Sequence, residues 1–418
     1  MTERTARARR VGVIGAGAAG IMAAIFAAAH GAETLLLERT RDGGRKILIS
    51  GGGRCNILPS RLEESRFVTD SSPHTLRNMI RSWPLQEQIA FFERDLGLPL
   101  MEEPASAKLF PVSERARDVR DGLLALAARH GARFMPNTVV TGFAPGAGEW
   151  RIERAGEAPL AVDAVVVATG GLSVPTTGSD GGGLEVLRAL GHVVHPTYAA
   201  LTPVVDEPPR FGSLAGVSLP VRLTARDGER SAAAAGGFLF THHGYSGPAV
   251  LDVSHVLVRA RAEGSAARLQ VRWTSLDSKE WTAALRADGG ASGGRSVGAV
   301  VRGELPARLA DALVQAAGID PARLLAQLRR EERLRLIEVL VRGELPWTGD
   351  EGYRKAEVTG GGVSLAEIDP RTMESRRHPG LYLSGELLDA FGPIGGYNFL
   401  WAWATGRAAG VGAARGGS

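Results

Sequence analysis

The sequence predicts an α/β fold, in which a Rossmann-like sheet domain is interrupted by an inserted block of different character. Near the N-terminus an apolar strand runs into a glycine-rich turn and an alanine-rich helix, and a similar pattern returns near the C-terminus. No second turn of this type lies between them. We therefore expect 1–195 and 353–418 to share one architecture, and the segment between them to differ from it, β-rich over 196–300 and helical over 301–352.

The N-terminal turn, GAGAAG, has the G-x-G-x-x-G spacing of dinucleotide-binding proteins. Gly15 permits the tight turn, Gly17 lets the backbone approach a pyrophosphate, and Gly20 lets helix and strand pack closely. The unpaired N–H groups of the first helical turn, which begins at Ala18 and Ala19, would then donate to the diphosphate at the positive end of the helix dipole.

An acidic residue follows where a ribose-binding residue is expected. Thr34–Leu37 is a second apolar strand, and Glu38 closes it roughly 20 residues after the fingerprint. A carboxylate here binds a ribose hydroxyl and disfavours a 2′-phosphate, so FAD or NAD fits better than NADP. A glycine-rich turn without a ligand is the alternative in a chain with 55 glycines, but the strand, the helix and Glu38 argue against it.

A cationic, glycine-rich segment, RTRDGGRKILISGGGRCN, comes next. Its backbone N–H groups can surround a phosphate or a flavin ring with little steric obstruction. We expect a mobile loop that contributes cofactor contacts, and a flexible surface loop without a ligand is the alternative. The residues assigned to the cofactor here are Arg39, Arg45, Lys46, Gly52, Gly53, Arg54, Cys55 and Asn56.

Further elements follow from periodicity and from residues that begin or end helices. Helices are expected over 74–96, with a break at Trp83-Pro84, over 116–130, with Ser113 as a plausible N-cap, and from about residue 183. Short strands are expected at 132–134, 138–143 and 150–154, and a buried strand at 163–169. In the inserted block we expect strands within 204–225 and 237–258, a loose loop at 286–295 and helical structure over 305–340.

The C-terminal part returns to the first pattern. A strand over 380–384 ends at Gly385-Glu386, and Asp389 and a helix over 399–410 follow. Asp389 and the helix N–H groups suit the ribityl and pyrophosphate side of FAD. The residues assigned to the cofactor in this part are Gly385, Glu386, Asp389, Gly396, Tyr397 and Asn398.

These motifs, above all GGRKILISGGGRCN after GAGAAG and Glu38, resemble the BaiN/RdsA-type (aminoacetone-oxidase-like) bacterial NAD(P)/FAD-dependent oxidoreductases over nearly the whole chain. The resemblance implies an FAD-binding domain of the two-dinucleotide-fold flavoprotein type with an inserted domain. It also implies an adenine contact at Val139 or Val140, and a second flavin-contact segment at Ala168, Thr169 and Gly170.

The chain departs from the family's usual pattern near the C-terminus. Residues 390–394 stand between GE-x-LD and GGYN, and Leu400 replaces a glutamine. The departure leaves the flavin contacts intact and the substrate undetermined. The segment THHGYSGP resembles a family segment that would place His242 near the substrate face, where it could relay a proton. The alternative for His242 is a polar turn without a catalytic role. Tyr397 could orient the substrate.

The resemblance implies an FAD-dependent oxidoreductase whose flavin takes hydride from transiently bound NADH or NADPH. The acceptor is an unsaturated substrate, either an enone-like small molecule or a uridine of ribosomal RNA. Two alternatives stay open: an FAD-dependent oxidase of a small aminoketone, and a nucleotide-binding scaffold without redox turnover. The oligomeric state is undetermined.

Composition narrows the setting. Cys55 is the single cysteine of 418 residues, so we expect a reducing, cytoplasmic environment, a packing role in the flavin pocket, and no metal site. The uncharged run Val11–Ala29 behind Arg9-Arg10 resembles an export signal or a membrane span, but its glycine spacing favours strand, turn and helix. The net charge is +4 and no basic run is interleaved with aromatic residues, which leaves RNA binding open.

Overall fold

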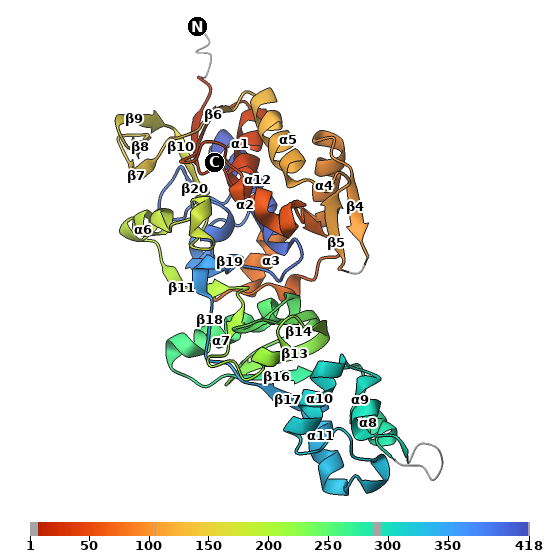
Figure 1. The fold of residues 1–418 in the computed structure, drawn as a ribbon. Coiled ribbons are helices and arrows are strands. Elements are labelled where there is room, and N and C mark those ends of the chain that lie inside the picture. The colour runs from red at the N-terminus through yellow and green to blue at the C-terminus, as the bar shows by residue number, and fades with distance from the viewer. Residues whose placement is uncertain (1–6, 105, 287–293, 417–418) are drawn as a thin grey trace, which may run out of the picture. The chain divides into compact units, whose positions relative to one another are not determined.

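The computed structural model describes residues 7–104, 106–286 and 294–416. The chain forms two compact units (Figure 1). Unit 1 comprises Met1–Tyr198 and Val358–Ser418, and unit 2 comprises Ala199–Glu357.

In the described part of unit 1, five parallel strands form the central sheet in the order β20-β10-β1-β2-β6. Their bounds are β1 (Arg10–Ile14), β2 (Glu33–Leu37), β6 (Arg133–Met135), β10 (Ala164–Val167) and β20 (Leu381–Leu383). The chain leaves β1 toward β2 and β6 and returns to the other side of β1 with β10. This change of direction is a topological switch point, and ligands of open α/β sheets bind outside the carboxyl ends of the strands there.

Two helices made largely of small residues cover the sheet. They are α1 (Ala18–Ala29) and α12 (Tyr397–Arg415). A Cβ added at Gly406 or Gly410 would lie 2.3 Å from the carbonyl oxygen of Ala19 or Ala23, respectively. Only glycine permits this approach of the two backbones, which explains the spacing of small residues on both helices.

Smaller elements surround this core. One antiparallel sheet is built from β3 (Leu58–Pro59), β4 (Leu100–Glu103) and β5 (Lys108–Pro111). A second antiparallel sheet is built from β7 (Val140–Pro145), β8 (Trp150–Arg154) and β9 (Glu157–Val162). In addition, β11 (Val194–Ala200) pairs with β19 (Val358–Val363). The helices are α2 (Arg45–Ile49), α3 (Pro73–Arg81), α4 (Leu85–Ala90), α5 (Ala116–Arg129) and α6 (Gly182–Ala189).

Two expectations for unit 1 were wrong. The segment predicted as a mobile loop contains helix α2, because Gly44 takes the left-handed conformation at its N-cap and Arg120 of α5 donates hydrogen bonds to the carbonyl oxygens of Asp42 and Gly43. Ser113 does not cap α5. Arg115 occupies the N-cap position, and its side chain forms no capping hydrogen bond.

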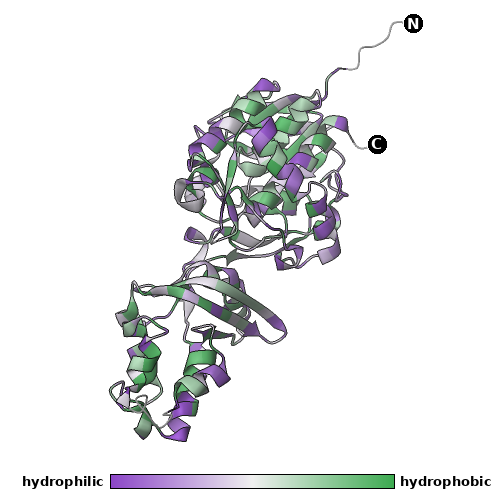
Figure 2. Cartoon of the chain, turned by 90° about the vertical axis from the view of Figure 1, so that its right-hand side faces the viewer, coloured by the Kyte–Doolittle hydropathy of each residue, from purple (hydrophilic) through white to green (hydrophobic). Residues whose placement is uncertain are grey.

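Unit 2 is built on an antiparallel sheet, with seven strands among its described residues, in the order β17-β16-β13-β14-β15-β12-β18. Its strands are β12 (Val204–Val205), β13 (Ser218–Asp227), β14 (Arg230–Phe240), β15 (Gly244–Ser246), β16 (Arg268–Arg272), β17 (Gly343–Leu345) and β18 (Gly349–Asp350). Buried hydrophobic residues alternate with more exposed residues along β13, and Figure 2 shows the chain coloured by hydropathy. One face is therefore buried and the other is exposed.

The buried face packs against α7 (Pro248–Glu263), a region predicted as strand. The prediction was wrong because the apolar residues of α7 follow directly on those of the preceding strand, and the two were treated as one strand segment. Val250, Val253 and Leu257 have helical spacing, and Pro248 is the first residue of the helix. The structure also contains α8 (Ser278–Ala284) and α9 (Val297–Arg302). The predicted helical segment 305–340 is divided into α10 (Ala307–Ala316) and α11 (Arg330–Arg342), and most of the predicted loop 286–295 lies outside the described residues.

Candidate functional site

The fingerprint turn has the geometry that its glycines predict. Gly15 has φ +99°, and a Cβ there would lie 2.6 Å from the carbonyl oxygen of Ala168. A Cβ at Gly20 would lie 1.8 Å from the carbonyl oxygen of Gly15. Gly17 differs from both, because no heavy atom of the described residues lies within 4 Å of the place where its Cβ would stand. The open space beside Gly17 suits an approaching ligand.

The N-terminus of α1 is free to bind an anion. No described side chain caps the helix, and its first turn contains no acidic residue. The N–H groups of Ala18, Ala19 and Gly20 have no intrahelical acceptor at this end, and the helix dipole is positive here.

Glu38 lies beside this helix end and is 8% exposed. One carboxylate oxygen, Oε2, accepts a hydrogen bond of 2.8 Å from the N–H of Ala16, and Oε1 accepts from the N–H and hydroxyl of Thr40 at 2.8 and 2.6 Å. Glu38 therefore holds the fingerprint turn in place. Its carboxylate has further acceptor capacity for a ribose hydroxyl. The N–H of Thr138 donates to the carbonyl oxygen of Glu38. Val139, the predicted adenine contact, is the residue after Thr138 in the chain.

Four strand ends meet at this carboxyl edge of the sheet. The fingerprint follows β1, Glu38 follows β2, Ala168–Gly170 follow β10, and Ser384–Glu386 follow β20. Two buried side-chain oxygens in these segments, Thr169 Oγ1 and Ser384 Oγ, have no hydrogen-bond partner among the described residues, and neither has Asn56 Oδ1 in the segment 39–56. Buried polar atoms are usually satisfied, so these three suit polar groups of a bound molecule.

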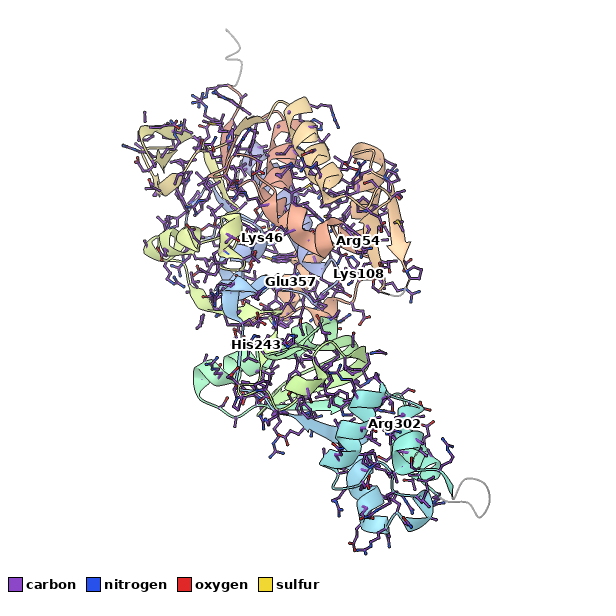
Figure 3. The ribbon with its side chains drawn as sticks, viewed as in Figure 1. Lys46, Arg54, Lys108, His243, Arg302 and Glu357 are labelled. Atoms are coloured by element: carbon purple, nitrogen blue, oxygen red, sulfur yellow. The ribbon has the colours of Figure 1, made fainter. Side chains whose placement is uncertain are left out.

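Lys46 and Glu386 form an ion pair that connects α2 to the end of β20 (Figure 3 labels Lys46). The Lys46 ammonium also donates to Ser173 Oγ at 2.7 Å, and Oε1 of Glu386 accepts from Ser173 and from the N–H and hydroxyl of Thr359. Burial alone would raise the pKa of Glu386, but the charge of Lys46 and these hydrogen bonds hold its pKa below the ordinary value. Ser173 and Thr359 were missed by the sequence analysis because neither belongs to a recognisable motif.

The three arginines assigned to the cofactor are engaged with protein groups. Arg39 bonds to the carbonyl oxygen of Gly178 and pairs with Asp180, and Arg45 pairs with Asp42 at 3.2 Å. Arg54 lies toward β4 and β5 (Figure 3), where it pairs with Glu103 and Glu114, 3.1 and 3.2 Å away. These contacts position the segment 39–56. Cofactor contacts from these arginines stay a prediction.

Cys55 is fully buried, and burial raises the pKa of its thiol to about 12. A neutral buried thiol is a poor nucleophile. This agrees with a packing role. Gly52 and Gly53, just before it, are exposed and have φ values of +68° and +87°.

Asp389 is buried within a cluster that the sequence did not indicate. Its Oδ2 accepts hydrogen bonds from Thr69 Oγ1 at 3.0 Å, from the N–H of Asp70 at 2.9 Å and from Ser71 Oγ at 2.8 Å. His195 Nε2 lies 3.7 Å from the same oxygen and 3.5 Å from Ser71 Oγ. Burial raises the pKa of Asp389, while the hydroxyl donors and His195 lower it, and the net direction is upward.

The residues at the start of α12 hold the chain around them. Gly396 has φ +89° and packs on Leu58. The Tyr397 hydroxyl accepts from the N–H of Glu63 and donates to the carbonyl oxygen of Arg61, both at 3.3 Å. The Asn398 side chain bonds to both the N–H and the carbonyl oxygen of Gly392. The Asn398 side chain thus fixes the loop 390–396 and the Tyr397 side chain fixes the segment 61–63. The N–H groups at the uncapped start of α12 stay free of side-chain acceptors.

His242 belongs to unit 2, in the exposed turn between β14 and β15. Its predicted catalytic role stays a prediction.

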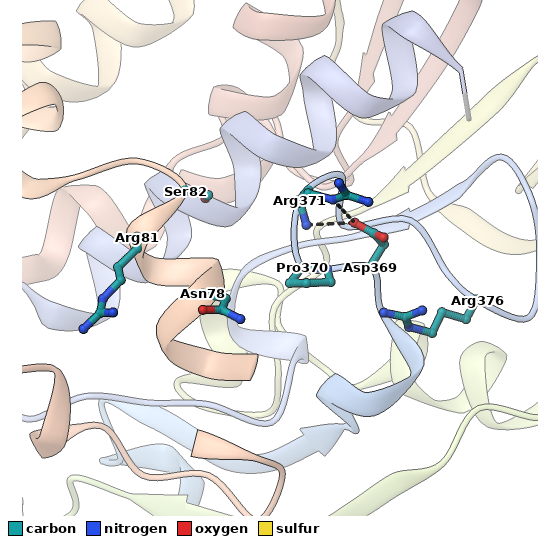
Figure 4. A pocket seen from close by; sticks show the side chains of 7 residues that line it. All are labelled: Asn78, Arg81, Ser82, Asp369, Pro370, Arg371 and Arg376. Atoms are coloured by element: carbon teal, nitrogen blue, oxygen red, sulfur yellow. Dashed lines mark hydrogen bonds and ion pairs between the residues drawn. The ribbon is translucent and has the colours of Figure 1, made fainter. Parts of the chain in front are cut away.

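Unit 1 also contains a pocket of about 570 Å³, which lies between α3 and the turn 369–376 (Figure 4). Its turn 369–376 runs beside the edge strand β20, since the N–H of Leu383 bonds to the carbonyl oxygen of Met373. The residues that line it are Asn78, Arg81, Ser82, Asp369, Pro370, Arg371 and Arg376. None of them was assigned to the cofactor by the sequence analysis.

The carboxyl edge fits FAD. The open space at Gly17 and the uncapped α1 suit the pyrophosphate, Glu38 suits the adenosine ribose, and the N–H groups of α12 suit the other half of the molecule. The described residues contain no group of three or more His, Cys, Asp or Glu side chains able to bind a metal. Within the same ranges no helix is long and apolar enough to cross a membrane.

Comparisons with known proteins identify the family of the chain. The family model for the HI0933-like protein Rossmann domain matches residues 9–412. A ribosomal RNA dihydrouridine synthase of Escherichia coli is 33% identical over 94% of this chain and 95% of its own length. A 3-dehydro-bile acid delta(4,6)-reductase of Clostridium scindens is 30% identical over 97% and 99%, respectively.

A solved structure shows the fold. The 3-ketosteroid delta1-dehydrogenase from Sterolibacterium denitrificans is 13% identical, and the match covers 97% of this chain and 99% of that chain with a TM-score of 0.53. The predicted fold class is confirmed, and the relatives confirm the predicted class of enzyme, an FAD-dependent oxidoreductase. The chain belongs to the HI0933-like family of Rossmann-domain proteins, as its sequence motifs predict.

Proposed function

We propose that this enzyme holds FAD at the carboxyl edge of the unit 1 sheet, takes hydride from transiently bound NADH or NADPH, and reduces a conjugated carbon–carbon double bond. The observation that carries the proposal is the meeting of an uncapped helix, the open space at Gly17 and the Glu38 carboxylate at one switch point. Bound FAD supplies the hydride chemistry, and the protein supplies position and electrostatics. The cytoplasm, where both nucleotides are available, suits this reaction.

The names of the relatives support the substrate class. Formation of dihydrouridine saturates a double bond conjugated to a carbonyl in the uracil ring, and a delta(4,6)-reductase acts on double bonds conjugated to a ring ketone. The common feature is a C=C bond polarised by a carbonyl group. We extend this feature, rather than either molecule, to the present enzyme.

Such a reduction adds a proton as well as a hydride. We propose His195 as the group in unit 1 that holds this proton. Its Nε2 lies 3.7 Å from the buried Asp389 carboxylate, which can orient the ring, and the side chain is 25% exposed. Tyr397 is less suited because its hydroxyl is bound to backbone groups.

Anaerobic mixing of the purified holoenzyme with NADH or NADPH tests the proposal. Reduction should bleach the flavin absorbance near 450 nm, which is roughly the position of the oxidised cofactor band. Bleaching by an aminoketone and by neither nucleotide would instead identify an oxidase. No bleaching by any of them would leave a nucleotide-binding scaffold.

A further inference from the structure

A network of buried polar side chains links segments of unit 1 that are far apart in the sequence. His192, just before β11, has a side chain without exposed surface, and its Nδ1 lies 2.8 Å from Oε2 of Glu367. Its Nε2 lies 3.2 Å from Oγ of Ser375, which is 5% exposed. Glu367 ends the short helical turn Leu365–Glu367 after β19, and Ser375 lies in the turn that runs beside β20.

The hydrogen bonds of Ser375 decide which nitrogen of His192 carries the proton. Ser375 Oγ accepts from the N–H groups of Arg377 and His378, both at 3.1 Å. Both of its lone pairs are therefore occupied, and its own proton is donated to Nε2 of His192. Nδ1 then carries the ring proton and donates it to Glu367. Burial lowers the pKa of His192 more strongly than the Glu367 carboxylate raises it, so the neutral ring that this arrangement requires is present at physiological pH.

The order Ser375, His192, Glu367 is that of the nucleophile, base and acid of a hydrolase. Ser375 is unable to act as a nucleophile here, because it is buried and no lone pair of its oxygen is free. The network therefore holds the chain rather than attacking a substrate.

The Glu367 carboxylate also holds the backbone that leads to His195. Its Oε2 accepts from the N–H of Val193 at 3.0 Å, and the N–H of Ser364 donates to the carbonyl oxygen of Val193 at 2.9 Å. Val193 is thus held at both of its polar backbone groups. Because His195 follows only two residues later, the place of its ring depends on these contacts.

The segment 363–367 holds the neighbours of His195 as well. The N–H of Leu365 donates to Oγ of Ser71 at 3.0 Å, and the carbonyl oxygen of Val363 accepts from the N–H of Asp389 at 2.9 Å. His195 Nε2 faces Ser71 Oγ at 3.5 Å and Asp389 Oδ2 at 3.7 Å. One short segment therefore sets the place of His195 and of the two groups beside it.

We propose that Glu367 is a positioning residue for the proton transfer of this enzyme. Its carboxylate, together with His192, keeps the start of β11 where His195 meets Asp389. Glu367 itself does not touch the substrate. The inference rests on the proposed function, in which His195 holds the proton that is added to the double bond.

Reoxidation of the reduced holoenzyme by a conjugated ketone is the first test. Enzyme reduced with dithionite is mixed anaerobically with 2-cyclohexen-1-one, and the return of the flavin absorbance is followed. Glu367→Gln should slow this step by about tenfold, which is part of the roughly 10²–10⁴-fold that a positioned acid contributes. Reduction of the flavin by NADPH needs no proton from His195, so its rate should not change.

Chemical modification of His195 is the second test and needs no substrate. The rate at which diethyl pyrocarbonate modifies this ring in the holoenzyme is measured by mass spectrometry of the peptides. Glu367→Gln should raise the rate by about threefold or more, because local opening exposes the imidazole more often. The exposed rings of His74 and His130 serve as internal references, and their rates should stay the same.

The matched control is Arg377→Gln. Arg377 is 46% exposed and pairs with the other carboxylate oxygen of Glu367, Oε1, so this variant removes the ion pair and leaves the bonds to His192 and Val193. It should keep the reoxidation rate and the slow modification of the wild type. Equal effects of the Arg377 and Glu367 variants would overturn the proposal. So would unchanged modification of His195 in Glu367→Gln.

If Glu367→Gln lowers the melting temperature, two substitutions of His192 decide the question. His192→Asn keeps an N–H donor near the position of Nδ1 and should retain slow modification of His195, whereas His192→Leu should not. Equal rates in these two variants would contradict the positioning role.

Failure of the proposed function gives a different result. If the wild type binds no flavin, or if its reduced form is not reoxidised by the ketone, the proposed function fails. The modification of His195 still decides whether Glu367 positions this ring. If reoxidation proceeds and is equally fast in Glu367→Gln, only the positioning inference fails.

Discussion

The carboxyl edge of the unit 1 sheet and the exposed face of strands β13 and β16 in unit 2 are built in two different ways. The edge presents backbone N–H groups and glycine conformations, and Gly15, Gly17 and Gly20 stand within six consecutive residues. The exposed face of β13 and β16 presents charged side chains from two strands, and Arg226 and Arg268 become neighbours only through strand register. A backbone-built site therefore leaves a signature in sequence, whereas a side-chain face assembled across strands does not.

Among substitutions at the carboxyl edge, one at Gly17 should give the largest loss of FAD affinity. In Gly17→Val the new side chain enters the open space assigned to the pyrophosphate, so FAD affinity should fall by roughly a hundredfold or more, equivalent to about 2.7 kcal/mol. FAD content after gel filtration measures this. Gly142→Val is the matched control, because a Cβ at Gly142 also meets no described atom within 4 Å. Equal FAD loss in both variants would refute a ligand at Gly17.

Breaking the Lys46–Glu386 pair should affect stability as well as binding. Lys46→Met leaves a largely buried carboxylate without its cation, which we expect to lower the free energy of unfolding by roughly 3 kcal/mol, the lower end for buried pairs, because the two side chains are 24% and 18% exposed. The double variant K46M/E386Q should lose less than K46M alone. Denaturant titration measures both, and strictly additive losses would contradict the coupling.

The same pair predicts a pH dependence. The pKa of Glu386 is lowered on folding, so its ionised form stabilises the folded chain above the unfolded pKa, and that stability is lost as pH falls through the folded value. The free energy of unfolding should decrease between about pH 5 and pH 3, and less steeply in Glu386→Gln. Parallel pH curves for the two proteins would contradict the assignment.

Removal of the Glu38 carboxylate should weaken FAD binding by roughly 1.5–3 kcal/mol, because charge-assisted hydrogen bonds are lost. Fluorescence titration of the apoprotein with FAD measures the dissociation constant. Since Glu38 also anchors the N–H of Ala16, Glu38→Gln provides a control that retains one oxygen acceptor. It should lose less affinity than Glu38→Ala, and an unchanged constant in Glu38→Ala would exclude the ribose role.

The smallest effect is expected at Cys55. With its pKa raised to about 12, the thiol is neutral at physiological pH, so a thiol reagent should label the folded protein only after denaturation. Cys55→Ala should leave the reduction of flavin by NADPH unchanged. Rapid labelling of the native enzyme, or loss of flavin reduction in the variant, would return Cys55 to the list of redox candidates.

Local sequence predicted much of unit 1 and less of unit 2. The fingerprint, Glu38 and the strands at 163–169 and 380–384 were predictable because glycine conformations and buried parallel strands are encoded by adjacent residues. Helix α7 was mistaken for strand, because its helical period follows directly on an apolar strand and the two were not separated. Helix α2 was mistaken for a loop, because Arg120, far away in the chain, supplies the hydrogen bonds that hold its beginning.

The sequence by itself determined the dinucleotide fingerprint, the acidic residue after the second strand, the α/β class and the family. These depend on backbone conformations and burial patterns that a few consecutive residues specify. Only the tertiary structure decided that Lys46 meets Glu386, that His195 lies beside Asp389, and that four arginines share one face of a sheet. Such contacts depend on topology and strand register, which bring together side chains from distant parts of the chain.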